Sequence, residues 1–166
     1  MTDANGMFLE KCFFSLQLPK EPAVGDEIVL KGVLKDDAKR CSVNLCLART
    51  EGNHPQAEPE RIAYHLGWRF YENGCEVLQC SKNSIWSDTQ FGSDDWISGR
   101  NISIIIRFHT DTVKVFIDHT QQPPEYEYEH QFPIEEVHSF ELWDDFDRVD
   151  EVTLKYSNRC ANGYYE

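Results

Sequence analysis

The chain has 166 residues, about the size of one domain, which is long enough to bury a core without disulfides or a structural metal. Its formal net charge is -13, yet 40% of its residues are hydrophobic and 13% are aromatic, which argues against disorder. Phosphate backbones are bound by clustered Lys and Arg, so we expect neither nucleic acid nor an anionic membrane surface as a partner.

The beginning of the chain shows no export signal. Residues 1–10 are polar and lack the basic and apolar regions of a signal peptide, and no apolar run is long enough to span a membrane. We therefore expect a cytoplasmic protein with one domain at 11–157, between a polar leader at 1–10 and a short tail at 158–166. In that compartment we expect reduced thiols rather than disulfides at the six cysteines, which are Cys12, Cys41, Cys46, Cys75, Cys80 and Cys160.

The first half of the chain reads as short β segments separated by turn residues. An apolar run over 28–34 follows Gly25 and Asp26, and the next strand, over 42–48, alternates apolar and polar residues. The polar stretch over 50–61 contains two prolines and is the longest loop within the body of the domain. Long ordered loops often lie near binding sites.

The second half continues the same pattern. Apolar residues alternate over 102–108 and again over 113–117, which predicts a hairpin with both apolar faces in the core. Further strands are predicted at 126–130, after a Pro-Pro break, and at 152–156. No helical periodicity appears, so the pattern predicts an all-β sandwich or barrel.

Catalytic and metal-binding motifs are absent from the sequence. It has no nucleophile elbow, no phosphate-binding glycine loop, no dinucleotide fingerprint and no zinc-protease helix motif, so we do not expect an enzyme. Cys41 and Cys46, like Cys75 and Cys80, are five positions apart, which places the partners on opposite faces of a strand and disfavours zinc. The acidic run over 144–151 lacks the glycine of a calcium loop, so we read it as a solvated face and expect neither metal nor cofactor.

Polar and aromatic residues with the chemistry of a sugar site gather over 62–91. Saccharides bind by stacking the apolar face of their ring on Trp, while side chains hydrogen-bond the hydroxyls. Side chains alternate along a strand, so His65, Gly67 and Arg69 share one face, and Trp86 follows on a later strand.

This segment resembles the galectins. Ile-Ala-Tyr-His-Leu-Gly-Trp-Arg-Phe at 62–70 is similar to the family's strand Ile-Ala-Phe-His-Phe-Asn-Pro-Arg-Phe, and Trp86 matches the Trp of its Trp-Gly-x-Glu-x-Arg motif. Further similarities cover most of the chain, at Gly25-Asp26, Ser42-Val43-Asn44-Leu45 and Phe132-Pro133-Ile134. The resemblance implies a two-sheet antiparallel β-sandwich, the galectin-like jelly roll of concanavalin-A-like lectin architecture. It also implies that His65 and Arg69 hydrogen-bond a galactose hydroxyl and that Trp86 stacks under the ring.

Other positions depart from the family motif. Relative to that motif, Gly67 replaces Asn, Trp68 replaces Pro, Cys80 replaces a second Asn, Thr89 replaces Glu, and Phe91 replaces an outer Arg. Each lost polar contact costs about 1.5–3 kcal/mol, against a total of about 4–8 kcal/mol for millimolar to micromolar sugar binding. Ordinary galactoside binding should therefore be lost unless other groups compensate. A one-residue shift would bring Asp88 to the Glu position, and Gln79 or Asn83 would replace the missing Asn.

Two functions stay open at this point. The first is a glycan-binding module with an incomplete β-galactoside site and weak or altered specificity. It would use His65, Arg69, Trp86, Asp88 and Thr89, with new contacts from Phe91, Trp68 or the 50–61 loop. The second is a protein-interaction module that has lost its sugar and uses Trp68, Phe91 or an edge strand, with Trp86 in packing and His65 and Arg69 as a pair that supports the strand. The family resemblance also allows a homodimer and export without a signal peptide.

Overall fold

The computed structural model describes residues 9–93 and 100–157, which form an all-β structure with one short 3-10 helix, η1 (Ile134–Glu136). Its strands are β1 (Cys12–Gln17), β2 (Glu27–Leu34), β3 (Arg40–Leu47), β4 (Arg61–Tyr71), β5 (Gly74–Asn83), β6 (Ile85–Trp86), β7 (Gln90–Ser93), β8 (Asn101–Phe108), β9 (Thr112–Ile117), β10 (Tyr126–Glu129), β11 (Val137–Asp144) and β12 (Phe146–Lys155).

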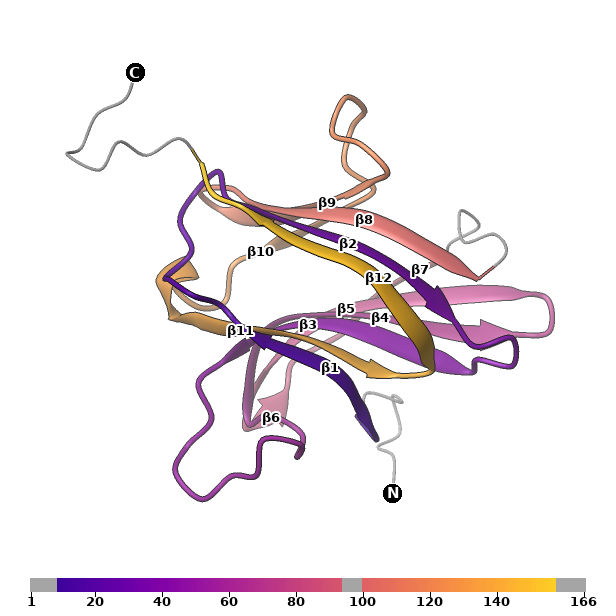
Figure 1. Ribbon diagram of the computed structural model, residues 1–166, viewed down its shortest axis with the longest axis horizontal. Coiled ribbons are helices and arrows are strands. Elements are labelled where there is room, and N and C mark those ends of the chain that lie inside the picture. The colour runs from indigo at the N-terminus through magenta and orange to yellow at the C-terminus, as the bar shows by residue number, and fades with distance from the viewer. Residues whose placement is uncertain (1–8, 94–99, 158–166) are drawn as a thin grey trace.

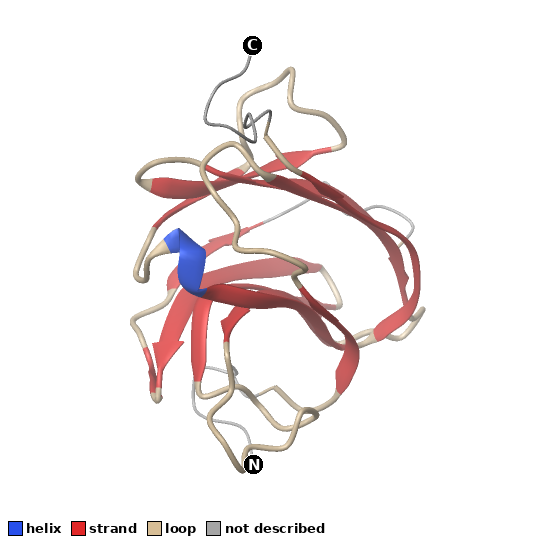
Figure 2. Cartoon of the chain, turned by 60° about the vertical axis from the view of Figure 1, so that its left-hand side comes forward, coloured by secondary structure: helices blue, strands red, loops and turns tan. Residues whose placement is uncertain are grey.

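The strands form two antiparallel sheets that face each other, as Figures 1 and 2 show. One sheet has the order β1-β11-β3-β4-β5-β6, with β7 also paired to β5, and the other has the order β10-β9-β8-β2-β12. The predicted hairpin is β8 and β9, in which Ile106 pairs with Val115. The expectation of a two-sheet antiparallel β-sandwich is confirmed.

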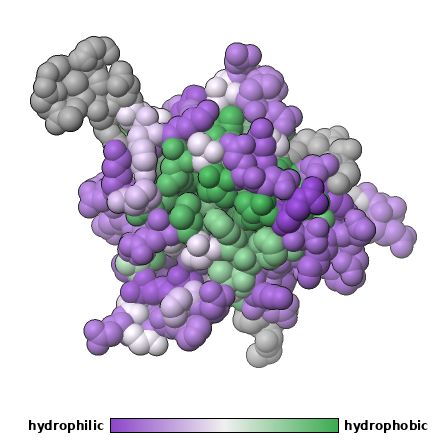
Figure 3. All heavy atoms as spheres, viewed as in Figure 1, coloured by the Kyte–Doolittle hydropathy of each residue, from purple (hydrophilic) through white to green (hydrophobic). Residues whose placement is uncertain are grey.

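The core lies between the two sheets. Alternate residues of β8 are buried, and Ile102, Ile104 and Ile106 are each at most 1% exposed, as the period of two predicts. Across the gap, β3 and β4 contribute Val43, Leu45 and Leu66 to the same cluster. Figure 3 shows hydrophobic residues gathered between the sheets, with hydrophilic residues around them.

A glycine turn before β2 lies against the residue Ser157, which follows β12. Gly25 has a φ of 97°, and a Cβ on it would lie 2.9 Å from the Cβ of Ser157, so no other residue fits without strain. The adjacent Asp26 carboxylate accepts hydrogen bonds from the N–H groups of Ala23 (2.9 Å) and Ser157 (2.7 Å). The Gly25-Asp26 pair therefore fixes the entry into the five-stranded sheet.

Trp68 does not form an exposed apolar surface, and the suggestion that it adds contacts beside a site or binds a protein is wrong. It is 1% exposed and packs in the core, because alternation along β4 turns it to the side opposite His65. Trp143 is also buried, as its assignment to packing requires. Trp96, assigned to packing as well, lies outside the described residues.

The burial of Trp68 predicts a large loss of stability on truncation. Trp68→Ala should lower the free energy of unfolding by about 3–5 kcal/mol, because it leaves a cavity between the sheets. Phe91→Ala is the matched aromatic control, since Phe91 is 56% exposed on β7, and it should cost less than about 1 kcal/mol. Urea unfolding of the two variants checks this, and equal losses would contradict the inward orientation of Trp68.

Candidate functional site

The candidate site lies on the outer face of the seven-stranded sheet, the face turned away from the core. Residues directly opposite each other in antiparallel strands point to the same side of the sheet. Strand register therefore places two rows of side chains across β3, β4 and β5, namely Asn44–His65–Cys80 and Ser42–Gly67–Leu78. The sequence pattern had already placed His65, Gly67 and Arg69 on one face of a strand.

His65 is held in a defined orientation by Asn44. The Asn44 amide donates from Nδ2 to Ser42 Oγ (2.9 Å) and to the Glu141 carbonyl (3.5 Å), so its Oδ1 is the atom that faces His65 Nδ1 at 2.7 Å. Because Oδ1 is an acceptor, Nδ1 carries the imidazole proton and Nε2 keeps an acceptor lone pair. The imidazole meets the Trp86 ring edge to face, with centroids 5.1 Å apart and an interplanar angle of 70°.

Gly67 and His65 fit together as a pair. A Cβ built on Gly67 would lie 2.7 Å from His65 Nε2 and 3.4 Å from its Cε1. The imidazole therefore lies over the glycine backbone and fills the space that a side chain at position 67 would need. The glycine that stands in place of the family's Asn is thus linked sterically to the position of His65.

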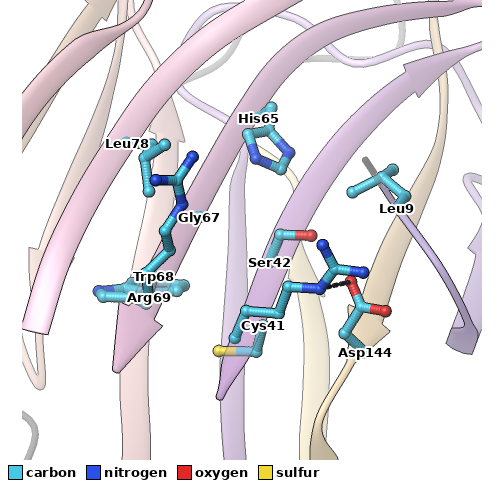
Figure 4. A pocket seen from close by; sticks show the side chains of 10 residues that line it. Leu9, Cys41, Ser42, His65, Gly67, Trp68, Arg69, Leu78 and Asp144 are labelled. Carbon is cyan, nitrogen blue, oxygen red and sulfur yellow. Dashed lines mark ion pairs between the residues drawn. The ribbon is translucent and has the colours of Figure 1, made fainter. Parts of the chain in front are cut away.

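Arg69 follows His65 and Gly67 along the same face of β4. Its Nη1 lies 3.4 Å from the Glu76 Oε1 on β5, while its buried Nη2 has no hydrogen-bond partner among the described residues. In Figure 4 the side chain runs along β4 toward Leu78. Arg69, His65 and Gly67 line one cavity of about 10 Å³, which has room for about one water molecule.

Trp86 stands beside His65 at the edge of the sheet, on β6. It is half-buried and packs against Leu78 and Cys80 on β5. The Lys82 Nζ lies 5.2 Å from the centroid of its ring and pairs with Glu58 from the β3–β4 loop. The indole is therefore fixed from several sides and still has surface open to solvent.

The other proposed positions do not line this cavity. Asp88 and Thr89 lie in the connection between β6 and β7, where Asp88 is exposed. Gln79 accepts a hydrogen bond from the hydroxyl of Tyr64 (2.5 Å), a core residue on the opposite side of the sheet from His65, so the suggested compensation by Gln79 is wrong. Asn83 is exposed at the end of β5 and pairs with Ile85.

A buried ion pair stiffens the floor of the outer face next to Asn44. Glu141 is 0% exposed and accepts hydrogen bonds from Arg49 (2.7 and 3.1 Å), Trp143 Nε1 (2.9 Å) and Ser139 Oγ (3.1 Å). Burial raises the pKa of Glu141, but the hydrogen bonds from Arg49, Trp143 and Ser139 outweigh burial and hold this pKa below its usual value. Sequence analysis missed Asn44 and Glu141, although polar residues alternating with core residues on β3 and β11 were a usable signal.

Leu9 was also missed, because it falls within the polar leader. It is 4% exposed and packs on the outer face against Cys46, Ile62 and Trp143. Its N–H donates to Glu58 Oε1 at 2.8 Å. An apolar residue at the end of a polar leader was a weak signal, and its partners are too distant in sequence for any local pattern to identify them.

The cysteines and acidic residues that the structure describes show neither a reactive buried thiol nor a metal-binding cluster. Five cysteines are free thiols, at positions 12, 41, 46, 75 and 80, and Cys160 lies outside the described residues. Burial raises the pKa of Cys41 and of Cys46 well above the usual thiol value, which makes both unreactive. Over residues 9–93 and 100–157 no group of three or more His, Cys, Asp or Glu is arranged to hold a metal, and no helix there has the length and apolar character to cross a membrane.

The contact between Gly67 and His65 predicts that a methyl group at position 67 destabilises the protein. Gly67→Ala should cost about 1–3 kcal/mol, because Cβ would overlap His65 Nε2 unless the imidazole moves. Gly92→Ala is the matched control, since a Cβ at Gly92 on β7 meets nothing within 4 Å. Urea unfolding measures both changes, and a Gly67 variant as stable as the Gly92 variant would refute the overlap.

The buried ion pair predicts a pH-dependent effect at Arg49. Arg49→Ala should lower the free energy of unfolding by about 3–5 kcal/mol at pH 7, because it leaves the Glu141 carboxylate buried without a cation. The lowered pKa of Glu141 stabilises the wild type above the usual carboxyl pKa, and this contribution is lost as the pH falls through the folded value.

Urea unfolding at pH 7 and at about pH 4 should therefore show a smaller difference between Arg49→Ala and the wild type at the lower pH. Arg148→Ala is the control, since Arg148 forms an exposed pair with Asp150 and its loss should cost less than about 1 kcal/mol. A loss for Arg49→Ala no larger than for Arg148→Ala would contradict the buried pair.

Comparison with known proteins agrees with the fold and the motif. The family model for galactoside-binding lectins matches residues 13–154. A 32 kDa beta-galactoside-binding lectin of Caenorhabditis elegans is 29% identical over 124 residues, which cover 74% of this chain and 40% of that protein. The chain thus spans less than half the length of this relative.

Solved galectin structures share the fold at low sequence identity. Galectin LEC-6 of Caenorhabditis elegans superposes with a TM-score of 0.69 at 14% identity, over 90% of this chain and 95% of that one. A variant of human galectin-16 gives a TM-score of 0.64 at 19% identity, over 91% of this chain and 100% of that one. Together with the family match over residues 13–154, these similarities show that the chain belongs to the galactoside-binding lectin family, the galectins, whose members are carbohydrate-binding lectins rather than enzymes.

Proposed function

We propose that this chain binds a glycan weakly, or with altered specificity, at an incomplete β-galactoside site formed by Trp86, His65 and Arg69. The observation that carries the proposal is the pairing of His65 with Trp86. Asn44 holds the imidazole so that Nε2 is an acceptor, and the Trp86 ring lies next to it at 5.1 Å. An acceptor fixed beside an indole is the combination that a sugar needs.

Each of these residues has a chemical role toward a sugar. The indole of Trp86 packs against the C–H groups on the apolar face of the pyranose ring. His65 Nε2 accepts a hydrogen bond from a hydroxyl, and the guanidinium of Arg69 donates to a ring or hydroxyl oxygen. Arg69 Nη2 has no partner among the described residues but is buried, so this contact requires the guanidinium to turn toward the ligand.

The substitutions around these residues favour a sugar with an apolar edge. Cys80 stands in the row of His65, and Leu78 pairs with Phe91 across β5 and β7 on the same face. Cys80 and Leu78 are buried against Trp86, whereas Phe91 is exposed. Phe91 gives no hydrogen bond to a hydroxyl, and a hydroxyl buried against it would lose its water. We therefore propose that a deoxy, O-methyl or N-acetyl group is preferred here over the free hydroxyl of galactose. Asp88 and Thr89 are proposed as further contacts at the rim.

A second function, protein binding through the same edge of the sheet, has its own supporting observation. Ile85 on β6 is 80% exposed and Phe91 on β7 is 56% exposed, so two large apolar side chains face solvent on strands that pair with β5. Exposed apolar residues on edge strands are typical of protein contacts, including strand addition. The glycan proposal ranks first because Ile85 and Phe91 do not explain the ordered His65–Trp86 pair.

Glycan titration with matched variants tests the proposal. Isothermal titration with lactose and with deoxy, O-methyl and N-acetyl sugars should give saturable binding to at least one of the modified sugars. Trp86→Ala should weaken this binding by at least about tenfold, which corresponds to about 1.4 kcal/mol.

Tyr156→Ala removes an aromatic side chain beyond the end of β12, in the opposite sheet, and should leave the affinity unchanged. No binding by folded wild-type protein would refute the glycan proposal and favour the protein-binding one. If Trp86→Ala binds the sugar as tightly as the wild type does, the sugar site does not include Trp86 and lies elsewhere on the protein.

A further inference from the structure

Polar residues in the middle of the outer face are buried although this face points away from the core. Asn44 and Glu141 are 0% exposed, Ser42 is 2% exposed and His65 is 4% exposed. The outer face of an antiparallel sheet ordinarily meets solvent. Groups from other parts of the chain must therefore lie over these residues.

Leu9 is one of those covering groups. Its side chain packs against Cys46 on β3, Ile62 on β4 and Trp143 on β11, so it lies across three adjacent strands with β3 in the middle. It also lines the same cavity as His65, Gly67 and Arg69. In Figure 4 Leu9 faces these residues from the opposite side of the cavity.

Two carboxylates hold the backbone of Leu9–Lys11 in place. The Leu9 N–H donates to Glu58 (2.8 Å), and the N–H groups of Glu10 and Lys11 donate to the same oxygen of Asp144 (3.2 and 3.0 Å). Glu58 also pairs with Lys82, which lies next to Trp86. The segment is thus tied to both ends of the proposed sugar site.

The contacts of this segment are separable from the rest of the fold. Leu9, Cys46, Ile62 and Trp143 form a small cluster apart from the main core between the sheets. Lifting Leu9–Lys11 would break its three hydrogen bonds to carboxylates, the backbone hydrogen bond from the Asp144 N–H to the Lys11 carbonyl (2.7 Å) and the ion pair between Glu10 and Arg40 (3.0 Å). It would leave every pair of strands intact. Segments held in this way open locally at a lower free energy than global unfolding.

We infer that Leu9–Lys11 is an intramolecular cover that competes with a glycan for the outer face beside His65. The identity of the competing ligand rests on the proposed function, whereas the cover itself does not. Displacing Leu9 exposes Trp143 and the polar floor around Asn44, which together offer stacking and hydrogen bonding to a sugar. In this arrangement the apparent affinity equals the intrinsic affinity multiplied by the fraction of molecules in which the cover is open.

Thiol alkylation tests the cover without any sugar. Leu9→Asp places a carboxylate in the apolar cluster of Cys46, Ile62 and Trp143, so the segment should detach from the sheet. Cys46, which Leu9 contacts, should then be alkylated by iodoacetamide at least about tenfold faster, as measured by peptide mass spectrometry. Cys41 is the internal control. It lines the cavity beside Leu9 but packs in the main core between the sheets, so its alkylation should accelerate as much as that of Cys46 only if the whole domain unfolds.

Val24→Asp is the matched control variant, because Val24 is 50% exposed and its replacement should change neither thiol. If Leu9→Asp fails to fold, Leu9→Ala gives the same test with a smaller perturbation. If the ratio of the Cys46 alkylation rate to the Cys41 alkylation rate is the same in folded Leu9 variants as in the wild type, Leu9–Lys11 is not a separable cover.

The glycan panel applied to the same variants separates the two proposals. Leu9→Asp should bind the preferred sugar at least about fivefold more tightly than wild type and Val24→Asp do. Equal affinities of Leu9→Asp and the wild type would show that the segment does not compete with the sugar. Selective exposure of Cys46 without binding of any sugar by either protein would support the cover and refute the glycan proposal.

Discussion

The alternation of side chains along β4 is the constraint on which both the core and the site depend. Tyr64, Leu66 and Trp68 are each at most 1% exposed and anchor the strand against the other sheet. Once these residues face inward, the residues between them must face outward. The outer positions of β4 therefore take their places from the packing of the core, which makes this strand a rigid base for a binding site.

The outer face behaves as a set of interdependent side chains rather than as a list of separate ligand contacts. Asn44 fixes the tautomer of His65, the imidazole lies over Gly67, and the Asn44 amide is in turn oriented by the Glu141 backbone. A change at any one of these positions alters the room or the hydrogen bonds of the next. An Asn at position 67 would therefore need the His65 imidazole to move, because the imidazole occupies the space of a side chain at that position.

Local patterns were sufficient for the fold and for part of the site. The alternation over 102–108 and 113–117 predicted β8 and β9, and the spacing of His65 and Arg69 predicted their common face. The prediction that Gln79 replaces the missing Asn was wrong, because Gln79 faces the core. Neighbouring residues along a strand face opposite sides of the sheet, so an error of one residue reverses the predicted side. The position of Leu9 was beyond prediction, because its hydrogen bond to Glu58 and its packing against Trp143 exist only when the sheet has formed.

The two carboxylate oxygens of Glu58 join three parts of the molecule. One accepts the Leu9 N–H, and the other pairs with Lys82 beside Trp86, while Glu58 itself belongs to the loop between β3 and β4. Lengthening or shortening this loop would move both contacts together without altering any residue that touches a ligand. Related domains with identical ligand-contacting residues but different loops here would then differ in how readily their grooves admit a sugar.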